Sequence, residues 1–110
     1  MAVITFSSDY GLTDHYVGVC HAVIARIAPD VRIIDIAHGV YGIRHGGVVL
    51  AQSLPFAPSG VHLAIVDPGV GTNRRAVVVV AVDGSMLVGP DNGLLPRGPM
   101  RSAVPSTPTS

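Results

Sequence analysis

Residues 2–36 read AVITFSSDYGLTDHYVGVCHAVIARIAPDVRIIDI, a run in which strand-like and helix-like patterns alternate. β-branched and aromatic residues predict a strand over residues 2–6, and VRIIDI predicts another over residues 31–36. Between them, apolar residues recur at spacings of three and four, which predicts a helix with Val17, Cys20, Ile24 and Ile27 on its apolar face. Thr13 can cap this helix, and Pro29 ends it. The run therefore predicts a strand, a helix and a second strand.

The same alternation continues downstream. Residues 43–54 predict a second helix closed by Pro55, although Gly46 and Gly47 each weaken it by about 1 kcal/mol relative to alanine. Further strands are predicted at residues 61–66, 75–82 and 86–88, the last two joined by a turn at Asp83 and Gly84. Because right-handed crossovers make the first strands parallel, we expect an α/β fold with a Rossmann-like, mostly parallel sheet and flanking helices.

Composition excludes several classes of function. The 110 residues have 48% hydrophobic and 13% charged side chains and a net charge of zero, which does not favour a nucleic-acid partner. Lysine and glutamate are both absent, so acid or base chemistry falls to Asp, His, Tyr or Cys. No apolar run approaches the length that spans a membrane, and no signal peptide or disulfide pair is evident, so we expect a cytoplasmic protein.

The composition changes after Leu95. Residues 96–110 are rich in Pro, Gly, Ser and Thr and offer few apolar side chains to a core. We therefore expect a folded unit over residues 1–95 and a disordered tail over residues 96–110. The abrupt change suggests a truncated or frame-shifted end.

Two clusters that follow predicted strands are candidate ligand sites, because open α/β sheets bind ligands beyond the carboxyl ends of their strands. Asp9 follows the first strand, where a carboxylate can accept hydrogen bonds from a vicinal diol such as a ribose. The alternative is that Asp9 only caps or shapes a loop.

The second cluster is DPGVGTNRR, residues 67–75. Its glycines allow a ligand to approach the backbone, and a turn there can bring Asp67 close to Arg74. An aspartate held by an arginine stays ionised and suits the orientation of a water molecule or a cation. A structural ion pair is the alternative. A third glycine is missing, so the segment is no dinucleotide fingerprint.

Other candidates are weaker. GPDNG at residues 89–93 is explained by turn chemistry. The histidines lack metal-ligand spacing, so we expect no metal site, and Cys20 is most simply a core residue. A Ser-His-Asp triad built on Ser7 or Ser8 is arbitrary without a nucleophile-elbow sequence.

Four segments together carry a family resemblance: ITFSSDYGLTDHYVG at 4–18, VRIIDIAHGV at 31–40, VHLAIVDPGVGTNRR at 61–75 and LVGPDNGLL at 87–95. The chain resembles, over residues 2–95, the N-terminal part of the S-adenosyl-L-methionine (SAM) hydroxide adenosyltransferases, also called SAM hydrolases (adenosine-forming). These enzymes are related to SAM-dependent fluorinases and chlorinases.

The resemblance implies attack of water or hydroxide on the ribose 5′ carbon of SAM, giving adenosine and L-methionine without a metal or redox cofactor. Asp9 matches the family aspartate that holds the ribose hydroxyls. Asp67 and Arg74 match two members of an Asp-Arg-His set around the attacking water. Hydrolysis is favoured over halogenation, because a carboxylate at position 67 would repel a halide.

The resemblance also implies parts that this sequence lacks. Family members continue into a C-terminal β-barrel domain and form homotrimers in which the substrate lies between neighbouring subunits. The histidine of the water-positioning set is expected beyond residue 95. The alternative to a working hydrolase is therefore a non-catalytic fragment that retains nucleoside binding or associates with intact subunits.

Overall fold

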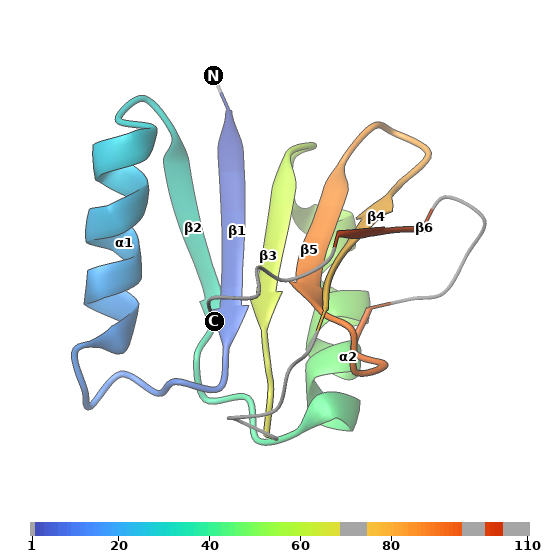
Figure 1. Cartoon of the computed structure of the whole chain (residues 1–110), viewed down its shortest axis with the longest axis horizontal. Helices are drawn as coiled ribbons and strands as arrows, with labels where there is room; N and C mark the ends of the chain where they lie inside the picture. Colours follow the sequence, from blue (N-terminus) through green and yellow to red (C-terminus); the bar gives the residue numbers. More distant parts are fainter. Residues whose placement is uncertain (1, 69–74, 96–100, 105–110) are drawn as a thin grey trace.

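The computed structural model describes residues 2–68, 75–95 and 101–104 of the chain, the last range by its backbone alone. These residues form one six-stranded sheet with the strand order β2-β1-β3-β5-β4-β6 (Figure 1). The strands, in chain order, are β1 (Val3–Ser8), β2 (Arg32–Ala37), β3 (Val61–Ile65), β4 (Ala76–Val80), β5 (Met86–Pro90) and β6 (Arg101–Val104).

The strand directions confirm the α/β prediction. β1 pairs in parallel with β2 and with β3, and β3 pairs in parallel with β5. β4 is antiparallel to both of its neighbours, β5 and β6. The turn between β4 and β5 contains Gly84 at a φ of 87°, which fits the Asp-Gly turn predicted there.

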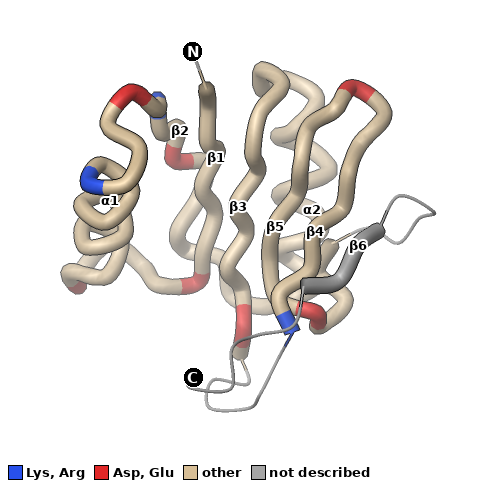
Figure 2. Tube along the Cα trace, turned by 45° about the horizontal axis from the view of Figure 1, so that its top comes forward, with Lys and Arg blue, Asp and Glu red and all other residues tan. Residues whose placement is uncertain are grey.

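Helices α1 (Tyr16–Ile27) and α2 (Ile43–Ser53) lie on opposite faces of the sheet (Figures 1 and 2). Helix α2 continues into a short 3-10 helix at Leu54–Phe56. Phe6 faces α1, where its ring lies 6.3 Å from the ring of His21. The alternate residue Thr5 faces the α2 side, as does the main apolar cluster. This cluster comprises Val40, Leu50, Ala64, Val66, Val77, Val79, Leu87, Leu94 and Leu95.

Helix α1 starts later than predicted. It begins at Tyr16 with His15 at its N-cap position, rather than at Thr13. The Asp14 carboxylate accepts hydrogen bonds from the backbone N–H and the ring Nδ1 of His15, at 2.8 and 2.7 Å, and this local turn competes with helix formation. Helix α2 agrees with its prediction to within one residue. None of the helices in the described ranges is long and apolar enough to cross a membrane.

The strands differ from the predictions at their ends, by up to two residues, and one strand was not predicted. β1 extends to Ser8, because Ser7 pairs with both β2 and β3 and Ser8 pairs with β3, although we expected both serines in a loop. Residues 101–104 form β6, although the whole tail was expected to be disordered. Without β6, the edge of β4 would have unpaired backbone N–H and C=O groups. Residues 101–104 contain no proline, so their backbone can pair with this edge whatever their side chains are. The remaining tail residues, 96–100 and 105–110, lie outside the described ranges.

Candidate functional site

The strand order places a topological switch point at the carboxyl ends of β1 and β3, where open α/β folds form their ligand crevice, and we call this place the crevice. The chain leaves β1 through α1 to reach β2 on one side, and then crosses the other face through α2 to reach β3. Connections that diverge in this way mark the point where open α/β sheets bind ligands. Acidic residues follow the ends of β1, β3 and β5 at this edge of the sheet (Figure 2).

Asp9 and Asp67 meet in this crevice, although they are 58 residues apart in the sequence. The backbone N–H of Asp67 donates a hydrogen bond of 3.0 Å to Asp9 Oδ2. The backbone N–H of Asp9 in turn donates to the carbonyl oxygen of Ile65 at 3.2 Å. Both aspartates are half-buried. The structure therefore brings together the acidic residues of the two clusters that the sequence singled out.

Asn92 links the end of β5 to the same crevice. Its side-chain Nδ2 donates to the carbonyl oxygen of Val66 at 2.7 Å, and its Oδ1 accepts from the backbone N–H of Leu94 at 3.1 Å. The next residue, Gly93, has a φ of 89°, as its turn motif predicts. Turn chemistry explains GPDNG, as predicted, but sequence reasoning missed that the amide of Asn92 also holds the backbone just before Asp67.

The predicted pairing of Asp67 with Arg74 lies outside the described residues, because the structure describes the chain up to Pro68 and again from Arg75. The far side of that segment is anchored near the crevice. The backbone N–H of Asp91 donates to the carbonyl oxygen of Arg75 at 2.8 Å. The described residues on either side of 69–74 therefore both lie at the edge of the sheet that carries Asp9.

A Ser-His-Asp chain is present beside Asp9, and it uses Ser8. Ser8 Oγ lies 2.6 Å from His38 Nδ1, and His38 Nε2 lies 2.8 Å from Asp35 Oδ1. Ser8 is 0% exposed, so its hydroxyl cannot reach a substrate as a nucleophile. This contact was missed because no sequence spacing links a residue at the end of β1 to one that follows β2.

Tyr10 follows Asp9 in the sequence and lies beside the first turn of α1. Burial raises the pKa of its hydroxyl, and the nearby Cys20 and Asp9 raise it further when they are charged. The ring lies 5.9 Å from that of Tyr16, the first residue of α1. Within the described part of the chain, no three His, Cys, Asp or Glu side chains are arranged to hold a metal ion.

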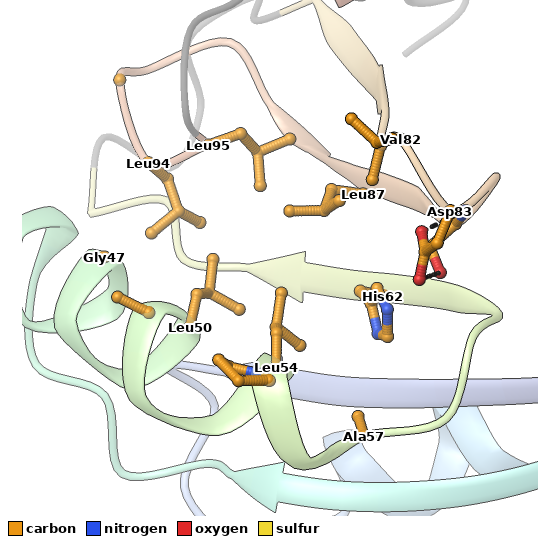
Figure 3. Close-up of a pocket in the computed structure, with 15 residues that line it drawn as sticks. Gly47, Leu50, Leu54, Ala57, His62, Val82, Asp83, Leu87, Leu94 and Leu95 are labelled. Carbon is orange, nitrogen blue, oxygen red and sulfur yellow. Dashed lines mark hydrogen bonds between the residues drawn. The ribbon is translucent and has the colours of Figure 1, made fainter.

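A separate cavity of about 800 Å³ lies on the α2 face of the sheet (Figure 3). Leu50 and Leu54 line it from one side, and Leu87 and Leu94 from the other. The lining also includes His62 and Asp83 but neither Asp9 nor Asp67. Burial lowers the pKa of His62, and Asp83 partly opposes this shift. The cavity is thus mainly apolar, and it is separate from the crevice that contains Asp9 and Asp67.

Comparison with known proteins gives a consistent family. The model of the SAM hydroxide adenosyltransferase N-terminal domain matches residues 4–102, and so extends past Leu95. A protein of Salinispora tropica named (R)-S-adenosyl-L-methionine hydrolase is 52% identical over 94% of this chain and 42% of its own length. The chain thus spans about two fifths of that relative.

A solved structure and a more distant relative agree with this match. The structure of an uncharacterized conserved protein from Thermotoga maritima superposes with a TM-score of 0.76 at 49% identity, covering 84% of this chain and 36% of that protein. A fluorinase of Actinopolyspora mzabensis is 31% identical over 70% of this chain and 27% of its own length. The chain belongs to the family of the SAM hydroxide adenosyltransferase N-terminal domain.

Proposed function

We propose that the protein carrying this chain hydrolyses SAM to adenosine and L-methionine. A water molecule attacks the ribose 5′ carbon, the bond from that carbon to the sulfonium sulfur breaks, and the sulfur keeps the electron pair as methionine leaves. The water gives up one proton, which is released to the solvent as adenosine forms. Because the sulfonium is already a good leaving group, the protein has to align the water and exclude bulk solvent.

The observation that carries this proposal is the meeting of Asp9 and Asp67 at the crevice between β1 and β3. In the proposal, Asp9 accepts hydrogen bonds from the ribose hydroxyls, and Asp67 orients the attacking water together with Arg74. The hydrogen bond from the backbone N–H of Asp67 to Asp9 Oδ2 fixes the Asp9 carboxylate relative to the Asp67 backbone. No metal or redox cofactor takes part.

The rest of the site comes from outside this chain. Because the chain spans 42% of its Salinispora tropica relative, we propose that residues 1–95 supply one part of a site that a second, β-barrel domain completes. A histidine beyond residue 95 joins Asp67 and Arg74, and neighbouring subunits of a cytoplasmic homotrimer enclose the substrate.

Hydrolysis is preferred over halogenation on two grounds. The relative named as a hydrolase is 52% identical to this chain, and the fluorinase is 31% identical. In addition, the carboxylate of Asp67 would repel a halide ion placed in the crevice. The hydrolase relative is named for the (R) form of SAM, so both sulfonium epimers belong in the assay.

Substitutions in the crevice test the assigned roles. Asp67→Ala and Arg74→Ala should each lower kcat by about 100-fold or more with little change in substrate affinity, because they remove the group that aligns the water. Asp9→Ala should instead weaken adenosine and SAM binding by about 10- to 100-fold, the effect of losing a charge-assisted hydrogen bond. Steady-state kinetics and calorimetry measure the two effects.

Asp30→Ala is the matched control, since Asp30 is an exposed aspartate that precedes β2, at the opposite end of the sheet. It should leave both kcat and affinity unchanged. Unaltered turnover in Asp67→Ala and Arg74→Ala would contradict the water-orienting role, and unaltered affinity in Asp9→Ala would contradict the ribose role. Binding of adenosine without any turnover by the unsubstituted protein would favour the non-catalytic alternative.

A further inference from the structure

A chain of polar side chains runs from Ser8, next to Asp9, to His21 on the side of α1 that faces the sheet. Ser8 contacts His38, and the other ring nitrogen of His38 contacts Asp35. His21 of α1 reaches both carboxylate oxygens of Asp35 from its Nε2, each at 3.0 Å. Ser8 and His38 are buried, whereas Asp35 and His21 are partly exposed. Four side chains from separate elements are thus connected beside Asp9.

The chemistry of the groups fixes the direction of these hydrogen bonds. Burial alone would raise the pKa of Asp35, but hydrogen bonds from His38 and His21 outweigh it and hold the pKa below its ordinary value. An ionised carboxylate only accepts, so His38 donates through Nε2–H. In the neutral imidazole, Nδ1 then accepts the hydroxyl hydrogen of Ser8. The Ser8 oxygen keeps lone pairs with which it accepts the backbone N–H of Tyr10 at 3.3 Å.

Backbone hydrogen bonds connect the chain on both sides of Asp9 to the segment that contains His38. The carbonyl oxygen of Ser8 accepts from the N–H of Val40 at 3.3 Å, and the N–H of Gly11 donates to the carbonyl oxygen of His38 at 2.7 Å. Residues 8–11 are therefore tied to residues 38–40 before and after Asp9. The ring of His38 also packs edge-on against Phe6, with ring centroids 4.6 Å apart, which limits its rotation.

We propose that Ser8 and His38 are positioning residues that hold the Asp9 carboxylate in the direction required to receive a ribose diol. This inference rests on the proposed function, because it takes Asp9 as the ribose-binding group. Neither residue touches the substrate, since both are buried. Misdirecting a recognition group by a fraction of an ångström is enough to weaken a hydrogen bond that depends on geometry.

The test compares two ligands that differ only in the diol. Calorimetry on the native protein gives the Kd for adenosine and the Kd for 2′,3′-dideoxyadenosine. The diol ratio, which is the Kd for 2′,3′-dideoxyadenosine divided by the Kd for adenosine, measures diol recognition. Ser8→Ala should reduce this ratio by about tenfold and leave the Kd for the dideoxy ligand unchanged. In an Asp9→Ala background, Ser8→Ala should change neither Kd, because its effect passes through Asp9.

Thr5→Ala is a matched control within the same strand. Thr5 Oγ1 makes a buried hydrogen bond of 2.8 Å to His62 Nδ1, similar to the Ser8 contact but on the α2 face and away from Asp9. Loss of this hydrogen bond should lower the stability of the protein, while the diol ratio stays at the value of the unsubstituted protein. A pair of His38 variants guards against a folding defect. His38→Asn keeps an acceptor near Ser8 and should retain more diol recognition than His38→Gln, which keeps a group near Asp35 instead.

The outcomes separate the inference from the proposed function. If the unsubstituted protein binds both ligands equally, the ribose role of Asp9 fails and the positioning role fails with it. If the unsubstituted protein prefers adenosine and Ser8→Ala keeps the full preference, only the positioning role is overturned. An equal loss in Ser8→Ala and Thr5→Ala, or an equal effect of Ser8→Ala in the Asp9→Ala background, also overturns it, because it shows a general structural effect.

Discussion

At the scale of single residues, His62 predicts how stability depends on pH. Its ring is buried against Thr5, and burial lowers its pKa. In the unfolded chain a histidine has a pKa of about 6.5. Below that pH, His62 is therefore protonated to a greater extent in the unfolded state than in the folded state. The free energy of unfolding should therefore fall as the pH drops below about 6.5.

His62→Asn should reduce this loss, because asparagine has no proton to gain. Urea unfolding gives the free energy of unfolding of the unsubstituted protein and of the variant at about pH 8 and at about pH 5.5. The decrease between the two pH values should be smaller for the variant. Identical pH dependence in His62→Asn and the unsubstituted protein would contradict the assignment.

The sequence was sufficient to predict that Asp9 and Asp67 lie close together, because both follow apolar strands and parallel strands end at the same edge of a sheet. Their roles in a site stay predictions. The sequence was not sufficient to predict His38 or Asn92. His38 acts on a residue 30 positions away and Asn92 on one 26 positions away. Such contacts depend on which strands become neighbours, and hydrophobic periodicity does not contain that information. The role of Arg74 stays a prediction.

At the scale of elements, helix α2 contains two adjacent glycines with different surroundings. A Cβ at Gly47 would have Leu94 O as its nearest neighbour, at 4.0 Å, whereas a Cβ at Gly46 would come within 2.5 Å of Leu94 Cδ1. Gly47→Ala should therefore stabilise the protein by about 0.5–1 kcal/mol through backbone entropy. Gly46→Ala should gain less or become destabilising, since Leu94 has to move within the packed cluster.

Denaturant unfolding of the two variants provides the comparison, with each serving as the control for the other. Equal stabilisation by both substitutions would contradict the packing described around Gly46. The same helix illustrates what local sequence can predict. Its apolar pattern and Pro55 fix α2 to within one residue, whereas the start of α1 depends on a side-chain contact of Asp14, and β6 depends on the open edge of β4.

At the scale of the whole molecule, the order of the strands links fold to function. Placing β3 beside β1, rather than beside β2, puts the segments that follow β1 and β3 on either side of one crevice. The alternation of strands and helices predicts a parallel α/β sheet. It does not predict that β4 lies between β5 and β6. Residues 76–80 are apolar and β-branched, and such a run is compatible with either strand direction.

The most direct test of the central claim is the fate of the water oxygen. The protein is incubated with SAM in heavy-oxygen water, and the products are analysed by mass spectrometry. We predict adenosine that carries one heavy oxygen in its 5′ hydroxyl, in equal amount with unlabelled L-methionine. Cleavage that yields 5′-methylthioadenosine, a 5′-halogenated nucleoside or no product would contradict attack of water at the 5′ carbon and, with it, the function assigned to this crevice.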